Sequence, residues 1–136
     1  MNLVTLDTVN STNDYAKGKI NSLEDKTVVH AFCQTSGRGR LNRQWLDLGN
    51  GNLFLTFILK PSDKFRQSYV NLTQYLSVIL VEILEEYGAV DVQIKWPNDV
   101  LVNGKKIAGI LAETVVQGDK FKGLVLGLGV NLNANE

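Results

Sequence analysis

The sequence contains very few of the residues from which metal sites and disulfides are built. Its 136 residues include one cysteine, Cys33, and one histidine, His30. A single cysteine cannot form an intramolecular disulfide, and these two residues are too few for a cysteine- or histidine-based metal site. Cys33 ends an apolar run, so we expect it to be a small core residue rather than a reactive thiol.

The sequence also has no excess of positive or negative charge and no long apolar run. The chain has 14 basic and 14 acidic residues, whereas proteins that coat nucleic acid usually present a broadly basic face. No stretch approaches the roughly 18–20 apolar residues of a membrane span, and the N-terminus lacks the pattern of a signal peptide. We therefore expect a one-domain cytoplasmic protein whose partners include neither nucleic acid nor a membrane.

What is present is the pattern of a globular α+β domain. Apolar runs predict strands, and apolar residues every three or four positions predict a long amphipathic helix. The expected strands cover residues 3–6, 27–33, 53–59, 92–96, 100–102, 106–116 and 121–132. The expected helices cover residues 13–20 and 66–87, and residues 34–52 are predicted to form a long loop.

The last expected strand has two very different faces. Its even positions from 124 to 132 are large and apolar, whereas three of its odd positions are Gly123, Gly127 and Gly129. Because side chains alternate across a strand, one face is core and the other is almost bare backbone. Either another backbone segment or a ligand approaches that bare face. Ala108 and Ala112 are predicted to extend it, on the Lys106 side of the preceding strand.

Positive charge is concentrated in one segment, which reads QTSGRGRLNRQW from Gln34 to Trp45. Neither a phosphate-binding G-x-x-x-x-G-K-[ST] loop nor a dinucleotide-binding G-x-G-x-x-G pattern is present. A single Arg-Gly tract in a neutral chain is weak evidence for nucleic-acid binding. The polar candidates at strand ends and in loops include no serine–histidine or cysteine–histidine pair. They are rich in cations and amides, which suit a polyanion such as a nucleotide, although each could be a solvated surface residue.

Several motifs resemble, in order and spacing, those of the biotin protein ligases. They are STN at 11–13, QTSGRGRLNRQW at 34–45, GNLFLTFIL at 51–59, KWPNDVLVNGKKIAGIL at 95–111 and GLGVNLN at 127–133. The resemblance covers essentially the whole chain. It implies an α+β fold with a mixed, largely antiparallel sheet and helices on one face, similar to the catalytic domains of class II aminoacyl-tRNA synthetases.

The resemblance also implies a two-step reaction. Biotin and ATP, with Mg2+, would give biotinyl-5′-AMP and pyrophosphate, and biotin would then pass to a lysine of a biotin carboxyl carrier protein. The carboxylate of biotin is already ionised at neutral pH, so the first step needs cations at the α-phosphate rather than a general base. The sequence does not fix the oligomeric state, although an exposed strand edge would favour a homodimer in this family. The alternatives are a lipoate or octanoate ligase on the same fold, and a biotin-binding module that cannot adenylate.

Individual residues take their expected roles from the positions that match the family. The positions that match biotin contacts are Ser11, Thr12, Asn13, Gln34, Gly37, Arg38, Gly39, Arg40 and Lys106. The positions that match nucleotide contacts are Arg38, Arg40, Arg43, Trp45, Lys95, Asn98, Lys106 and Asn131. The positions expected to act in catalysis are Arg38, Arg40, Lys106 and Asp99, of which Asp99 is a candidate base for the acceptor lysine.

The sequence departs from the family in two places. Leu41 and Asn42 stand where many members have arginine and glycine, which makes the loop less basic and stiffer. The chain ends at Glu136, so we expect residues 1–136 to be a catalytic domain that is incomplete at its C-terminus. We expect neither an N-terminal DNA-binding domain nor a C-terminal β-barrel domain. Without ligand, we expect the arginine loop to be the least ordered segment.

Overall fold

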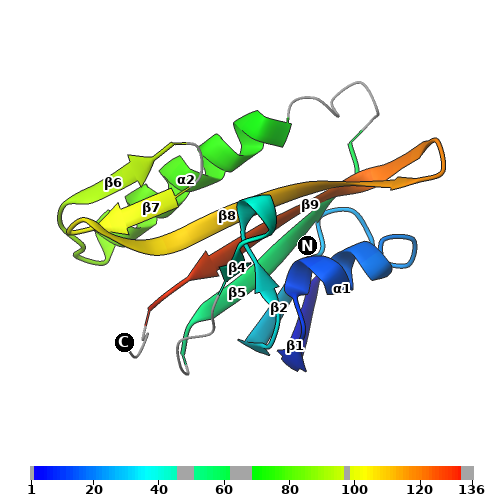
Figure 1. Ribbon diagram of the computed structural model, residues 1–136, viewed down its shortest axis with the longest axis horizontal. Coiled ribbons are helices and arrows are strands. Elements are labelled where there is room, and N and C mark those ends of the chain that lie inside the picture. The colour runs from blue at the N-terminus through cyan, green and yellow to red at the C-terminus, as the bar shows by residue number, and fades with distance from the viewer. Residues whose placement is uncertain (1, 46–50, 62–68, 97–98, 133–136) are drawn as a thin grey trace.

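Seven strands form one mixed sheet whose order is β1-β2-β5-β9-β8-β7-β6 (Figure 1). The computed structural model describes residues 2–45, 51–61, 69–96 and 99–132. Strands β1 and β2 run parallel, and the other neighbouring pairs are antiparallel. The strands of this sheet are β1 (Leu3–Val9), β2 (Val28–Gln34), β5 (Leu53–Leu59), β6 (Val92–Lys95), β7 (Asp99–Val102), β8 (Lys105–Gln117) and β9 (Lys120–Val130).

The remaining elements are two helices and a small hairpin. Helix α1 is Thr12–Gly18, and helix α2 is Tyr69–Glu86. The hairpin pairs β3 (Gly37–Arg38) with β4 (Gln44–Trp45), and a 3-10 turn η1 (Arg40–Asn42) joins them. None of the helices that the structure describes is long and apolar enough to span a membrane.

The two helices cover opposite faces of the sheet, whereas the sequence analysis expected helices on one face. On one face, α2 contributes Leu80 to a core that also contains Leu126 and Leu128. On the other face, α1 contributes Ala16 and Ile20 to a second core, which contains Val29, Ile58 and Val125. The strands carry buried apolar side chains on both sides, so each side needs its own cover. The mixed, largely antiparallel sheet itself is confirmed.

Tight turns lie at both ends of strand β8. Asn103 and Gly104, between β7 and β8, both have positive φ angles of 53° and 77°. This is the backbone that an Asn-Gly hairpin requires. Gly118, between β8 and β9, has a φ of 66°. These turns place the long strands β8 and β9 side by side along most of their lengths.

A β-bulge changes which residues of β8 share a face of the sheet. Val100 pairs with Ala108, but the next residue, Leu101, pairs with Lys106, which leaves Ile107 as an extra residue. The bulge reverses the alternation of faces along the strand. Ala108 therefore lies in the α2 core, and the expectation that it extends the bare face beside Lys106 was wrong. Ala112 packs against the same α2 core.

Candidate active site

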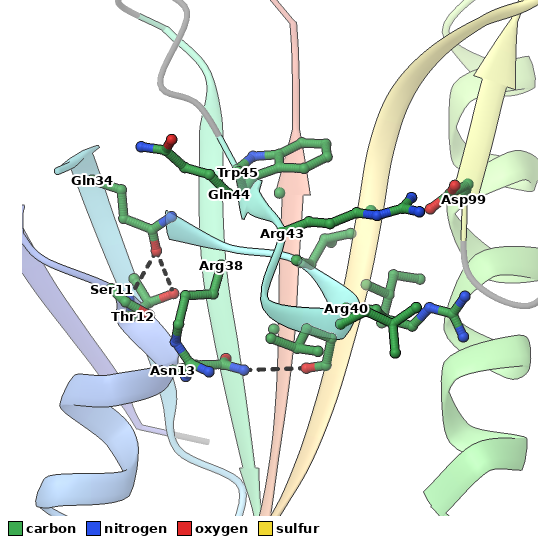
Figure 2. Close-up of a pocket in the computed structure, with 18 of the residues that line it drawn as sticks. Ser11, Thr12, Asn13, Gln34, Arg38, Arg40, Arg43, Gln44, Trp45 and Asp99 are labelled. Carbon is green, nitrogen blue, oxygen red and sulfur yellow. Dashed lines mark hydrogen bonds between the residues drawn. The ribbon is translucent and has the colours of Figure 1, made fainter. Parts of the chain in front are cut away.

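A pocket of about 140 Å³ lies on the α1 side of the sheet (Figure 2). Its walls come from the start of α1, the end of β2 and the β3–β4 hairpin. Its floor comes from β8 and β9. Segments that are far apart in the sequence thus meet where the bare face of β9 was predicted. The glycines left open whether a backbone segment or a ligand approaches the bare face of β9. In the structure the β3–β4 hairpin covers part of this face, and the pocket lies beside it.

One end of the pocket is a network of hydroxyl and amide groups. The Thr12 backbone N–H and side-chain hydroxyl both donate to Gln34 Oε1, at 2.8 and 3.1 Å. The hydroxyl of Thr56 lies 2.6 Å from Asn13 Oδ1 and 2.8 Å from Thr12 Oγ1. Asn13 Nδ2 donates to the Leu111 carbonyl at 3.2 Å. These residues are buried, apart from the half-buried Leu111, so the bonds fix their orientation.

Ser11 borders the same end of the pocket and also begins helix α1. Its hydroxyl accepts a hydrogen bond from the Asp14 N–H at 3.2 Å, which is the usual arrangement at a helix N-cap. Ser11 is therefore the N-cap of α1. The side chain is 3% exposed and lines the pocket, so Ser11 both caps the helix and belongs to the site.

The floor of the pocket is made of three glycines that other side chains approach closely. A Cβ atom at Gly127 would collide with the side-chain amide of Asn13. A Cβ atom at Gly129 would collide with the indole of Trp45, and one at Gly109 would lie 3.0 Å from the same ring. Only glycine leaves the space that these two side chains occupy.

The arginine segment forms a short hairpin over residues 37–45, where the sequence analysis predicted a loop. The Gly39 N–H donates to the Arg43 carbonyl at 2.6 Å, and Leu41 at the tip has a φ of 57°. Arg40 and Arg43 are exposed, and neither has an ion-pair partner among the described residues. Figure 2 shows both extending from the hairpin toward the side of the pocket where Asp99 lies. They are two of the cations at this end of the pocket.

Lys106 joins the hairpin to the sheet at the same end. Its Nζ lies 3.0 Å from Asp99 Oδ1 and 5.2 Å from the centroid of a Trp45 ring. The second distance is within the range of a cation–π contact. The Lys106 side chain is 44% exposed, so it can exchange these partners for a ligand without a large cost.

Arg38 lines the pocket, but both of its terminal nitrogens face carboxylates. Nη2 lies 2.6 Å from Asp14 Oδ1 and 2.7 Å from Glu113 Oε1, and Nη1 donates to Glu113 Oε2 at 3.3 Å. Lys17 adds a second cation, 3.0 Å from Glu113 Oε2. The charges of these four side chains cancel. Arg38 therefore brings less net positive charge to the pocket than its sequence position suggested.

The pKa values of this pair shift in the directions that favour both charges. Burial alone would raise the pKa of Glu113, but hydrogen bonds from Arg38, Lys17 and Asn13 outweigh burial, so the pKa lies below its ordinary value. The hydrogen bond to Glu113 raises the pKa of Arg38 against the opposing effect of burial, and Asp14 adds to it. Glu113 is therefore a carboxylate at neutral pH.

The pocket brings together most of the predicted site residues. Those that line it are Ser11, Thr12, Asn13, Gln34, Arg38, Gly39, Arg40, Arg43, Trp45, Asp99 and Lys106. Gly37 lies behind this wall, where a Cβ atom would be 2.5 Å from the Trp45 carbonyl. Asn98 lies outside the described residues.

Besides Gly37, two predicted residues that the structure describes do not line the pocket. Lys95 is exposed at the end of β6. The Asn131 N–H donates to the Ile107 carbonyl at 2.7 Å, while its Oδ1 is buried without a partner in the described part of the chain. Trp45 Nε1 is likewise buried without one. Both atoms could pair with a bound ligand.

The sequence analysis named as site residues neither Gln44 and Gly109, which line the pocket, nor two polar residues that bond to its side chains. Thr56 is fully buried at 0% exposure, and Glu113 binds three side chains around the pocket. Each left a signal in the sequence. Thr56 is a hydroxyl inside the otherwise apolar strand LFLTFIL, and Glu113 is a charge in the middle of a long apolar strand. A polar group in such a place needs a partner.

Comparison with known proteins agrees with this geometry. The model of the biotin/lipoate A/B protein ligase family matches residues 5–131. The chain is 38% identical over 113 residues to the bifunctional ligase/repressor BirA of Bacillus subtilis. It is 35% identical over 127 residues to the biotin–[acetyl-CoA-carboxylase] ligase of Paracoccus denitrificans. The biotin protein ligase from Aquifex aeolicus, solved in complex with biotin and ATP, superposes with a TM-score of 0.84 at 36% identity.

These similarities cover most of this chain but only part of each relative. They include 83% of this chain and 34% of the Bacillus protein, and 90% of this chain and 51% of the Paracoccus protein. The Aquifex structure covers 99% of this chain, which spans 54% of the Aquifex chain. The family resemblance noted in the sequence is confirmed over nearly the whole chain.

Proposed function

Because the chain belongs to the biotin/lipoate A/B protein ligase family, we propose that it holds the biotin- and ATP-binding site of a biotin–protein ligase. In the first step biotin and ATP form biotinyl-5′-AMP and pyrophosphate. In the second step biotin is transferred to a lysine in the carrier domain of a biotin-dependent carboxylase. The Aquifex neighbour is described as bound to biotin and ATP, which supports the choice of these two substrates.

The observation that carries the proposal is the division of the pocket into two chemically different ends. Thr12, Asn13 and Gln34 offer buried hydroxyl and amide groups, which suit the neutral ureido ring of biotin, with its N–H donors and carbonyl acceptor. The other end carries Arg40, Arg43 and Lys106, which suit phosphates. One elongated ligand with a polar ring at one end and a phosphate at the other matches both.

In the first step, a carboxylate oxygen of biotin attacks the α-phosphorus of ATP. A phosphorus–oxygen bond to biotin forms as the bond to pyrophosphate breaks. Both reactants are anions, so the step requires positive charge near the transferred phosphate. We assign this task to Lys106 and Arg40. Lys106 reaches the floor of the pocket, and its present partner, Asp99, can be exchanged because the pair is partly exposed.

In the second step, the amine of the acceptor lysine attacks the biotinyl carbonyl. An amide bond forms, AMP leaves and the amine gives up a proton. Asp99 is our candidate acceptor for that proton, because it lines the pocket beside Lys106. When a ligand phosphate takes Lys106, the Asp99 carboxylate loses its 3.0 Å partner and becomes free to accept a proton.

Magnesium enters this proposal with ATP. The residues that the structure describes contain no cluster of three or more His, Cys, Asp or Glu side chains that could hold a metal ion. Mg2+ bound to phosphates typically keeps few protein ligands, so a resident metal cluster is not required. MgATP is therefore the substrate form that we propose.

Pyrophosphate release provides the test. We expect release when MgATP and biotin are both present, and not when biotin is replaced by lipoate or octanoate. Release with lipoate or octanoate instead of biotin would show a different acyl ligase of the same family. Biotin binding in a calorimetric titration, without pyrophosphate release, would show a binding module and contradict the proposed adenylation.

A further inference from the structure

Glu113 occupies an unusual position for a glutamate. It lies within the 13-residue strand β8, on the face that carries the pocket, and its side chain is only 20% exposed. Three donors converge on its two oxygens. Arg38 comes from the hairpin, while Lys17 and Asn13 come from helix α1. A single carboxylate thus connects the sheet, the helix and the hairpin.

The hairpin depends on contacts of this kind for its position. Each of its strands has two residues, and a two-stranded hairpin is marginally stable by itself. At its entrance, the backbone N–H groups of Thr35 and Ser36 donate to Val9 and Asn10. Beyond that point, the contacts to the sheet include the Trp45 ring on the glycine floor, the Lys106 ammonium beside that ring and the Arg38 pair with Glu113. Arg38 also pairs with Asp14 of helix α1, at 2.6 Å.

We propose that Glu113 is a positioning residue, which holds the hairpin against the sheet through Arg38 and fixes the orientation of Asn13. Its contact with Arg38 uses both oxygens, at 2.7 and 3.3 Å. Its contact with Asn13 turns Nδ2 toward β8, which leaves Oδ1 for Thr56. Glu113 thereby links Asn13, at the amide end of the pocket, to the hairpin that carries Arg40 and Arg43. The effect on catalysis rests on the proposed function, whereas the effect on the hairpin does not.

The position of the hairpin can be read from Trp45 fluorescence. The chain has two tryptophans, and Trp96→Phe removes the other one, which is 69% exposed. In that background, Glu113→Gln keeps the shape of the side chain but removes its charge. We expect the Trp45 emission to move to longer wavelength and its quenching by acrylamide to increase. Lys17→Gln is the matched control, because it removes a different partner of the same carboxylate and should leave the emission unchanged.

The reaction provides a second readout. We expect Glu113→Gln to lower kcat/KM for biotin in pyrophosphate release by about tenfold, the size of one charge-assisted hydrogen bond. Lys17→Gln should stay within about twofold of the wild type. Glu113→Gln should have a smaller effect in an Arg38→Ala background, because its contact with Arg38 is already absent there and its contact with Asn13 remains to be changed.

The outcomes separate the two proposals. A wild type that releases no pyrophosphate with biotin contradicts the proposed function, while the fluorescence still tests the role of Glu113. Unchanged Trp45 emission in Glu113→Gln overturns that role, as does an equal shift in Lys17→Gln. If circular dichroism shows that Glu113→Gln does not fold, Arg38→Gln breaks the same contact from the more exposed side. Unchanged emission in Arg38→Gln then overturns the proposal.

Discussion

The two faces of strand β9 show how one element can serve stability on one side and binding on the other. On the α2 side, Leu124, Leu126 and Leu128 are buried, at 2%, 7% and 7% exposure. On the α1 side, Gly127 and Gly129 lie beneath the side chains of the pocket. Burial of large side chains stabilises the sheet on the first face. On the second face, the glycines bury no side chain of their own, which leaves room for other groups to lie close to the backbone.

The largest expected effect is on activity alone. We predict that Lys106→Ala lowers pyrophosphate release by about 10²–10³-fold, the usual range for loss of one group that stabilises developing charge. The fold should remain, because the side chain is 44% exposed and lies outside both cores. Initial rates and a urea denaturation curve on the same sample check both parts. Rates within a few-fold of wild type would remove Lys106 from the proposed chemistry.

The face of β9 that carries Leu124, Leu126 and Leu128, here called the leucine face, should affect stability but not binding. Leu126→Ala should lower the free energy of unfolding by about 2–5 kcal/mol, through lost burial and the cavity left behind. Biotin binding below the unfolding transition should change little, because Leu126 does not line the pocket. Denaturant unfolding and a calorimetric titration measure the two quantities. A large loss of biotin affinity in the folded variant would show that the two faces are not independent.

On the face of β9 that carries Gly127 and Gly129, we expect a substitution to lower biotin affinity, by a smaller factor than Lys106→Ala lowers the rate. In Gly127→Ala the new methyl group collides with Asn13, which Thr56, Leu111 and Glu113 hold in place. We expect about a tenfold loss of biotin affinity, because Asn13 must leave its hydrogen bonds. Gly18→Ala at the end of α1 is the matched control, since a Cβ atom there meets nothing within 4 Å. Equal biotin affinities for Gly127→Ala and Gly18→Ala would contradict the role given to the glycine floor.

Much of this arrangement could be predicted from the sequence, because it depends on local patterns. Strand β5 has the predicted bounds, 53–59, since its continuous apolar run is flanked by Gly51 and Pro61. The bare face of β9 followed from the alternation of side chains along a strand. The pocket residues in the family motifs were also found together. Each of these conclusions needed only neighbouring residues or a resemblance that covers the whole chain.

The features that the sequence analysis missed depend on contacts between distant segments. Residues 37–45 form a hairpin although they read as a loop, because Trp45 rests on Gly129 and Arg38 reaches Glu113. Nothing within the segment itself predicts those partners. The bulge at Ile107 likewise reversed the expected faces of the two alanines. One extra residue is enough to move every later side chain to the other face.

The smallest expected effect is a change in acid sensitivity on the pocket face. The pKa of Glu113 is lowered in the folded state, so its contribution to stability is complete above the unfolded glutamate pKa of about 4.3. That contribution is lost as the pH falls below this value through the lowered folded pKa. Glu113→Gln has no such group, so the wild type should lose more stability than Glu113→Gln between pH 7 and pH 3.

Urea midpoints measured for both proteins at a series of pH values check this prediction. Arg38→Gln should lie between them, because it removes one partner of Glu113 but leaves Lys17 and Asn13 in place. Parallel curves for all three proteins would mean that the carboxylate gains nothing from these contacts on folding. Glu113 could then not hold the hairpin through its charge.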